Sequence, residues 1–220
     1  MMMPNINEAQ INRYSTQVQG SRNAALNLEA ITDELLYRLI RSKQGDEQTR
    51  ALNELVGRYY LPLRSFFARL TIGQLQDAED LTQETFLRVI KFQGAAPPVF
   101  RAWIFTIGRN LAYDHFRLAA NRHETNTLEN LENEQEDLAA CSIMRSAEEL
   151  ALQKLDAADL QNALRQIPLP QREVLILRFY HNMKLDEIAQ VIACPPGTVK
   201  SRLLRGLINL KKHLDGGVSE

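Results

Sequence analysis

The stretch of sequence that decides most about this chain is DAEDLTQETFLRVIK (77–91), which leads through a Gly/Pro-containing loop into AWIFTIGRNLAYDHFR (102–117). Apolar residues recur at helical spacing in both pieces, so each is predicted to form an amphipathic helix. The first helix would carry carboxylates along one face. The second combines aromatic rings, an amide and arginines, which are the groups with which proteins hold single-stranded DNA.

The rest of the chain also follows helical periodicity, and no segment alternates apolar and polar residues as a strand does. Pro62 is expected to bend or restart the helix in which it lies. The fold class is therefore predicted to be all-α, with two small helical domains joined by an acidic flexible linker. The expected divisions are an N-terminal extension (1–30), a first domain (31–122), the linker (123–150) and a second domain (151–220).

Charge is distributed unevenly, although the 220 residues carry a formal net charge of only −1. Residues 124–149 contain eight acidic side chains and one arginine, whereas residues 197–213 contain five lysines and arginines and no acid. The whole molecule therefore lacks the basic excess of a simple nucleic-acid binder. Opposite charges in separate segments indicate separate partners.

Cysteine usage and hydropathy predict an intracellular protein. Cys141 and Cys194 are far apart in sequence and form no CxxC motif, which is consistent with a reducing cytoplasm. The N-terminus does not look like a signal peptide, and no apolar run approaches the roughly 20 residues that span a bilayer. The expected localisation is cytoplasmic, without membrane insertion.

A helix-turn-helix pattern is present in LDEIAQVIACPPGTVKSRLLRGL (185–207). Residues 186–192 supply its first helix and residues 193–196 its turn, and Pro196 suits the first position of the next helix. Val199, Leu203 and Leu207 are spaced four apart and would pack that helix on the core. An ordinary hairpin with a solvated basic face is the alternative. The opposite face would meet phosphates and base edges in the DNA major groove through Thr198, Lys200, Ser201, Arg202 and Arg205.

The acidic helix presents Asp77, Asp80 and Glu84 on one face, with Gln83 beside them. This face is either a docking surface for a basic partner helix or a plain solvated surface, and charge patterning alone favours the second. The residues expected to face the core are Leu81, Phe86, Val89 and Ile90.

The helix that follows carries a polar stripe of Asn110, Asp114 and Arg117. Asn can bond to a base edge, and Arg can bind phosphate or stack on a base. A base pulled from the stack needs a pocket with aromatic and hydrogen-bonding walls. Taken alone, such a helix is more often core with a polar outer side. The other candidates for this base-binding surface are Phe100 and Arg101 before the helix and Arg109 and Tyr113 on it.

With PQREVLILRFY (170–180), these motifs resemble the extracytoplasmic-function (ECF) group of the sigma-70 family of RNA polymerase sigma factors, over about residues 33–214. The resemblance implies a region 2 domain at 31–122 and a region 4 domain at 151–214, with no region 3 domain between them. The linker would thread toward the polymerase active-site channel, and a plain solvated tether is the alternative.

The resemblance also implies the partners of each surface. Asp77, Asp80, Gln83 and Glu84 would dock on the beta-prime clamp helices of core RNA polymerase, and region 4 would meet the beta flap. Promoter DNA would be bound at the −10 element by the base-binding surface and at the −35 element by the outer face of the helix-turn-helix. An anti-sigma factor is the further implied partner. No cofactor or catalytic residue is implied.

Two departures from the family pattern stand out. The stripe is followed by Leu118-Ala-Ala-Asn-Arg122 instead of a basic run, so weaker affinity for the DNA backbone is expected. The turn glycine common in the second domain is Ala193.

Two other classes of function fit the sequence less well. A conventional helix-turn-helix regulator would bind an operator without polymerase, but it leaves residues 77–117 without a role. An enzyme is disfavoured because His115, His123, His181 and His213 show no metal-ligand spacing with the cysteines, and no P-loop or GxSxG motif occurs.

Overall fold

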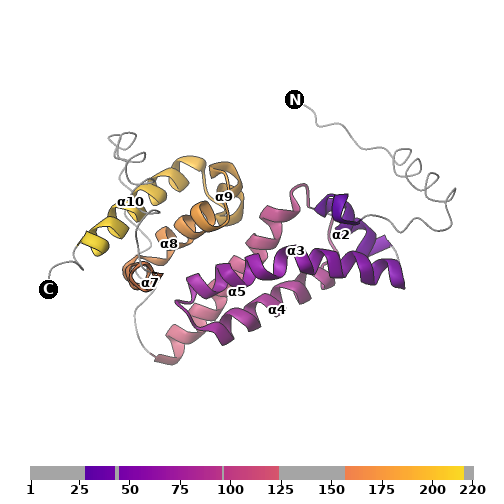
Figure 1. The fold of residues 1–220 in the computed structure, drawn as a ribbon, viewed down its shortest axis with the longest axis horizontal. Helices are drawn as coiled ribbons and strands as arrows, with labels where there is room; N and C mark the ends of the chain where they lie inside the picture. Colours follow the sequence, from indigo (N-terminus) through magenta and orange to yellow (C-terminus); the bar gives the residue numbers. More distant parts are fainter. Residues whose placement is uncertain (1–27, 43–44, 96, 124–156, 216–220) are drawn as a thin grey trace. The chain divides into compact units, whose positions relative to one another are not determined.

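The computed structural model describes residues 28–42, 45–95, 97–123 and 157–215, and over these residues the chain is helical with no strand. The all-α prediction is confirmed for this part of the chain (Figure 1). The predicted N-terminal extension and acidic linker lie almost entirely outside the described residues. The elements are η1 (Leu28–Ala30), α2 (Asp33–Ser42), α3 (Asp46–Leu70), α4 (Leu75–Lys91), α5 (Phe100–His123), α7 (Ala157–Gln166), α8 (Leu169–Leu175), η2 (Ile176–Tyr180), α9 (Leu185–Ile192) and α10 (Pro196–Asp215).

Helices α2 to α5 form one bundle, in which α2 packs on α3, α3 on α4 and α4 on α5 (Figure 1). Its core contains the rings of Phe66, Phe67 and Phe105, each at most 1% exposed. Burying one such side chain contributes roughly 1.5–3 kcal/mol, so these rings supply much of the stability of the bundle. Gly108 allows the close approach of α5 to α3, because a Cβ at this position would lie 2.9 Å from the Phe67 ring.

Pro62 lies inside α3, which continues without interruption from Asp46 to Leu70. A new helix therefore does not start at the proline. A proline within a helix costs about 3 kcal/mol through one lost hydrogen bond and a steric clash. Tyr59, Leu63 and Phe66 are buried on either side of it. Their packing on the neighbouring helices offsets that cost.

Helix α4 buries Leu81, Phe86 and Val89 as expected, but Ile90 is 44% exposed, so the expectation for Ile90 was wrong. Consecutive residues on a helix are separated by about 100° around its axis. Val89 and Ile90 therefore cannot both point to the centre of one face, and Val89 takes the inward position.

The start of α5 is held by side chains from α2 and α3. The Glu34 carboxylate accepts a hydrogen bond of 3.0 Å from the backbone N–H of Phe100, one of the helix donors that has no partner within the helix. The Phe100 ring is fully buried, with its centroid 5.4 Å from the ring centroids of both Tyr37 and Tyr59. These contacts set the direction in which α5 leaves the loop.

Helices α7 to α10 pack around α10, which contacts α7, α8 and α9. The predicted helix-turn-helix is present as α9 and α10, with α10 beginning at Pro196. Val199, Leu203 and Leu207 are at most 2% exposed, which confirms their predicted inward position. The Glu187 carboxylate closes the first turn of α9 by accepting a 2.8 Å hydrogen bond from the Lys184 N–H.

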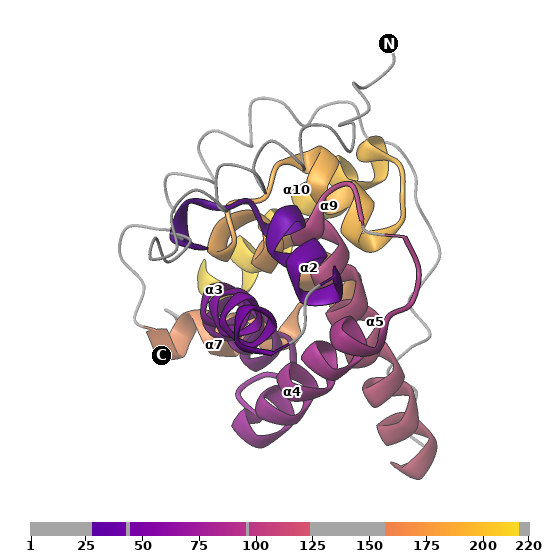
Figure 2. The same cartoon turned by 90° about the vertical axis from the view of Figure 1, so that its right-hand side faces the viewer.

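The helices on the two sides of the undescribed segment 124–156 also contact one another within the compact unit that begins at Asp33. Helix α5 packs against α9, and α3 packs against α8 and η2 (Figures 1 and 2). Helices α2 to α5 are the first helical group and α7 to α10 are the second. The predicted base-binding helix α5 therefore lies against the second helical group.

Candidate polymerase and nucleic-acid interfaces

The predicted docking surface is on α4, and its carboxylates are accessible. Asp80 and Gln83 are exposed, whereas Asp77 and Glu84 are partly exposed. Glu84 forms an ion pair with Arg88 one turn later, at 3.2 Å, and Asp77 lies 3.3 Å from the imidazole of His115 on α5. Exposed pairs of this kind contribute little to stability, so the acids remain open to a basic partner.

The polar stripe on α5 is at the surface. Asn110 is exposed, and the Arg117 side chain is 66% exposed. The Arg117 guanidinium donates a 2.7 Å hydrogen bond to the Asp114 carboxylate, which fixes the position of the guanidinium on this stripe. An amide and a guanidinium on one exposed helical face can bond to base edges and phosphates.

The other α5 candidates are not on that face. Phe100 is buried in the aromatic cluster, so its ring supports the helix start. The Arg101 guanidinium donates a hydrogen bond to the backbone oxygen of His181, at the end of η2. The Arg109 guanidinium binds the Glu173 carboxylate of α8 through two hydrogen bonds of 2.8 and 3.3 Å. It also lies 4.2 Å from the centre of the Tyr113 ring. The structure thus divides the predicted −10 residues into three sets. One is the surface stripe, the second is Arg101 and Arg109 with Tyr113 beside it, at the second helical group, and the third is Phe100, buried within the first bundle.

The Arg109–Glu173 pair is strongly desolvated. The Glu173 side chain is 0% exposed and that of Arg109 is 18% exposed. Burial raises the pKa of Glu173, and the Arg109 charge opposes that effect. The pKa of Tyr113 is raised, first by burial and then by the nearby Glu173 charge. A buried carboxylate is tolerated only when cations and hydrogen bonds compensate it. For Glu173 the largest compensation comes from Arg109, and the charge of Arg202 adds to it.

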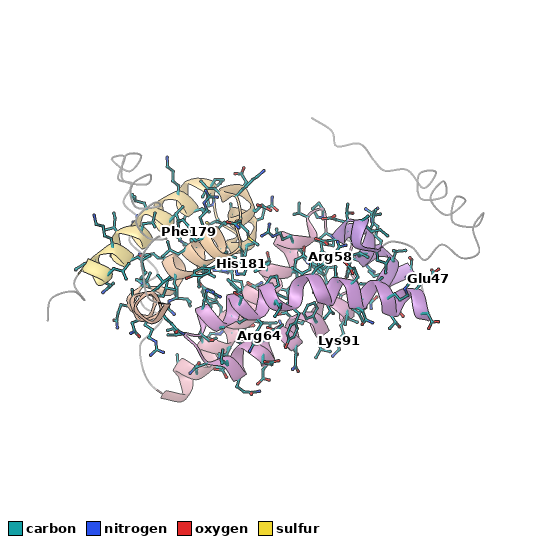
Figure 3. The ribbon with its side chains drawn as sticks, viewed as in Figure 1. Glu47, Arg58, Arg64, Lys91, Phe179 and His181 are labelled. Carbon is teal, nitrogen blue, oxygen red and sulfur yellow. The ribbon has the colours of Figure 1, made fainter. Side chains whose placement is uncertain are left out.

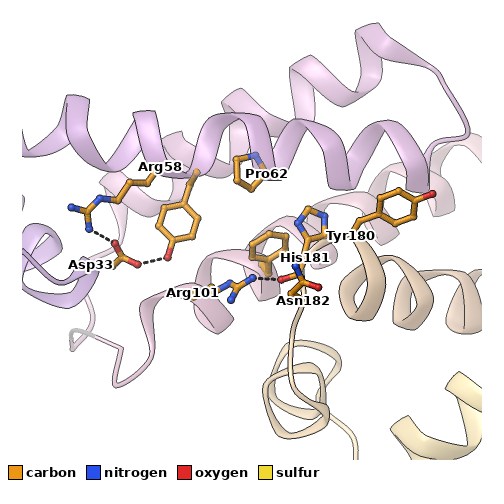
Figure 4. A pocket seen from close by; sticks show the side chains of 9 residues that line it. Asp33, Arg58, Pro62, Arg101, Tyr180, His181 and Asn182 are labelled. Atoms are coloured by element: carbon orange, nitrogen blue, oxygen red, sulfur yellow. Dashed lines mark hydrogen bonds and ion pairs between the residues drawn. The ribbon is translucent and has the colours of Figure 1, made fainter. Parts of the chain in front are cut away.

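A cavity of about 320 Å³ lies between α3, α5 and η2. Figure 4 shows the side chains that line it. On one side of it, Arg58 bonds to Asp33 at 2.8 Å, and the Tyr59 hydroxyl donates to the other oxygen of the same carboxylate. On the other side lie Arg101 and His181, joined by the hydrogen bond already described. The cavity lies at the seam between the two helical groups, and its polar groups are largely paired with one another.

The predicted −35 residues lie on α10, opposite its buried apolar positions. Lys200 is exposed, and Thr198, Ser201, Arg202 and Arg205 are partly exposed. The Ser201 hydroxyl donates a 3.0 Å hydrogen bond to the Thr198 carbonyl oxygen. A basic, hydroxyl-bearing face on the second helix of a helix-turn-helix can enter a major groove.

Comparison with known proteins decides the family. The family description "Sigma-70 region 2" matches residues 55–122, and "Sigma-70, region 4" matches residues 157–210. The ECF RNA polymerase sigma factor SigX of Bacillus subtilis is 30% identical over 141 residues, which are 62% of this chain and 70% of SigX. The chain belongs to the ECF sigma factors.

Two further comparisons extend the match. The ECF RNA polymerase sigma factor BldN of Streptomyces coelicolor is 35% identical to this sigma factor over 149 residues, which are 65% of this chain but only 53% of BldN. This sigma factor therefore spans about half the length of that relative. The solved structure of CnrH in complex with the cytosolic domain of CnrY has 26% identity and a TM-score of 0.54, and covers 84% of this chain and 97% of that one.

Three residues of this sigma factor that lie at the seam were not predicted as site residues from the sequence, namely Arg172, Glu173 and His181. Arg172 is 8% exposed, and its guanidinium donates to the carbonyl oxygens of Leu70 and Ile167 at 3.1 and 2.9 Å. Burial lowers its pKa to about 10, so it stays protonated at neutral pH. A signal for the first two was present in the sequence, because Arg172 and Glu173 stand directly before the apolar run VLIL (174–177). A helix that buries this run must also bury one or both of these charges.

Over the described residues, no helix is long and apolar enough to cross a membrane. The same part of this sigma factor holds no cluster of three or more His, Cys, Asp and Glu side chains that could bind a metal ion.

Proposed function

We propose that this sigma factor binds core RNA polymerase in the cytoplasm and directs initiation at promoters with its own −10 and −35 elements. The acidic face of α4 would dock on the beta-prime clamp helices, the surface stripe of α5 would capture the melted −10 strand, and α10 would bind the −35 duplex. The region 4 helices would also meet the beta flap. The observation that carries this proposal is that matched region 2 and region 4 segments present an acidic face and a basic face in the same chain.

The first experiment is transcription by bacterial core polymerase on fragmented source DNA, with and without the protein, followed by mapping of the RNA 5′ ends. New discrete starts that share two upstream motifs are expected. Sequence-specific duplex binding by the protein alone, with no new starts, would instead favour a conventional helix-turn-helix regulator.

The docking surface is tested by reversing charge at two of its exposed or partly exposed positions, Asp80→Lys with Glu84→Lys. We expect loss of polymerase binding in a pull-down, because the surface would then repel a basic partner. Asp46→Lys with Glu47→Lys is the matched control, since it makes the same change in net charge at exposed positions of α3. Normal binding by the first variant would refute the docking assignment.

The −35 assignment is tested with Arg202→Ala. A bidentate contact from Arg to a base pair provides about 1–3 kcal/mol of discrimination, so transcription should lose its preference at one −35 position. Lys211→Ala is the control, because Lys211 is an exposed basic residue of α10 that lies beyond Arg205, the last residue of the proposed contact face. An unchanged promoter preference for Arg202→Ala would remove this residue from the base-reading set.

The proposal includes an anti-sigma factor as a partner. The support is that CnrH was solved with the cytosolic domain of CnrY, and that the RpoE structure from Bartonella quintana, which has a similar fold, contains the anti-sigma factor NepR. A partner that binds this sigma factor should suppress the starts mapped in the transcription experiment.

A further inference from the structure

The cavity between α3, α5 and η2 contains a buried polar atom that the chain leaves without a partner. His181 is 7% exposed, and its Nε2 atom forms no hydrogen bond with any of the described residues. The same side chain lines the cavity (Figure 4). Buried polar atoms in native proteins are nearly always hydrogen-bonded, so an unpaired one that borders a cavity marks a place where another molecule can bind.

The cavity also carries a positive charge that no carboxylate balances. Arg101 donates to the His181 carbonyl oxygen, and within the described part of the chain it forms no ion pair. A guanidinium has several N–H donors, and one neutral acceptor uses few of them. By contrast, Arg58 on the other side of the cavity is paired with Asp33 and with Glu54, each at 2.8 Å. The charge of Arg101 is therefore available to a ligand with one negative charge.

His181 supplies a second donor beside Arg101. Burial, and then the charges of Arg101 and Arg69, lower its pKa to about 4, so the imidazole is neutral at neutral pH. A neutral imidazole can carry its proton on Nε2 and donate it to an anionic oxygen. Because Arg101 is hydrogen-bonded to the backbone of the same residue, both donors border one end of the cavity.

The remaining walls fit a planar apolar group. The rings of Phe105, Tyr180 and Pro62 line the cavity. Phe105 is 1% exposed, and its ring centroid lies 5.0 Å from that of His181, so packing fixes its position. The volume of about 320 Å³ is at the lower end of the range of about 300–1,000 Å³ that is typical of ligand pockets. Apolar walls with a few placed polar groups are the usual composition of a small-molecule site.

The segment that carries His181 has an irregular backbone. Residues Ile176–Tyr180 form a π-helical turn, and Asn182 has a φ of 50°. Turns of this kind are rare and occur frequently at functional sites. Here the irregular backbone lets three consecutive residues, 180 to 182, line one cavity. In a regular α-helix such residues would point in directions about 100° apart.

We propose that this cavity binds a small aromatic carboxylate, with its carboxylate group on Arg101 and the His181 Nε2 atom and its ring between the apolar walls. The two oxygens of a carboxylate match the parallel N–H groups of a guanidinium. A phosphate monoester fits less well, because it carries up to about two negative charges at neutral pH and the cavity balances one. The site is a property of the free chain and requires neither polymerase nor promoter DNA.

The test uses the free full-length protein, labelled with ¹⁵N, and cinnamate as the probe. Titration followed by amide NMR shifts should show saturable binding, with the largest shifts at Arg101, Phe105 and Asn182. Cinnamamide has nearly the same shape without the charge. It should bind about 10-fold or more weakly, because a hydrogen bond to an ionised group is stronger than one between neutral groups. This comparison needs no substitution, so it decides even if a variant fails to fold.

Two variants test the anchoring groups. Arg101→Gln removes the charge and keeps an amide that can donate to the His181 carbonyl oxygen. It should weaken cinnamate binding about 10- to 100-fold and affect cinnamamide much less. His181→Leu removes Nε2 and should weaken cinnamate binding in the same direction. The matched control is Arg64→Gln, because Arg64 is a partly exposed arginine of α3 that does not line the cavity (Figure 3). It should leave cinnamate binding unchanged.

The absence of saturable cinnamate binding, or equal affinity for cinnamamide, would overturn the proposal. Full affinity in Arg101→Gln, shown to be folded by far-UV circular dichroism, would also overturn it. Shifts confined to residues outside the cavity would have the same meaning. Transcription with core polymerase is a separate measurement, so failure of the promoter assignment would leave the result of this titration intact.

Discussion

Acid should destabilise this sigma factor through His181, and the size of the effect follows from its surroundings. His181 is 7% exposed, and its imidazole contacts the rings of Phe66 and Phe105 and is near the cations Arg69 and Arg101. Burial, and then these two charges, lower its pKa from 6.5 to about 4. At about 1.36 kcal/mol for each pH unit, the folded state therefore favours the neutral imidazole by about 3 kcal/mol.

The sign follows from proton linkage. Because the folded pKa is lowered, the unfolded chain binds the proton first as the pH falls below 6.5. The contribution to stability is fully present above pH 6.5 and is lost as the pH falls through 4. Between pH 7.5 and pH 4.5 the loss from this one group should be about 2.5 kcal/mol.

The assay is urea unfolding at pH 7.5 and pH 4.5 for the parent and for His181→Leu, which has no titrating group. The parent should lose about 2.5 kcal/mol more than the variant over this range, since the titration of carboxylates is common to both. His213→Leu, at an exposed position of α10, should behave like the parent. Equal losses in the parent and His181→Leu would show that the imidazole is not held neutral at the seam.

Three substitutions test the local structure by urea unfolding at neutral pH. Ala193 has a φ of 53° at the end of α9, and Ala193→Gly should stabilise the protein by about 1 kcal/mol because glycine adopts this conformation without strain. The control Ala189→Gly lies within α9 and should instead destabilise the protein by about 1 kcal/mol. Changes of the same sign in both variants would refute the argument. Gly108→Val should cost roughly 1–3 kcal/mol, because its Cβ would overlap a phenylalanine ring of α3, and a neutral effect would contradict the close helix contact. Glu34→Ala should cost about 1 kcal/mol through loss of the cap on the Phe100 N–H, whereas Glu34→Gln should recover part of it.

The secondary structure and most inward positions of this sigma factor could be predicted from the sequence, because both depend on residues close together in the chain. The four-residue spacing of Val199, Leu203 and Leu207 was enough to place the buried face of α10. Pro196 marked the start of that helix for an equally local reason, since proline suits the first turn. The exposed residues of the α4 and α5 faces could be identified in the same way.

What the sequence could not determine was which polar residues meet across the fold. Periodicity assigns a residue to a face but does not name the element that covers that face, so Phe100, Arg101 and Arg109 were all assigned to one DNA surface. Tertiary packing buries the first of these and joins the other two to α8 and η2. A carboxylate such as Glu173 has no preferred local partner, so only the folded chain, which excludes water around it, decides that it pairs with Arg109.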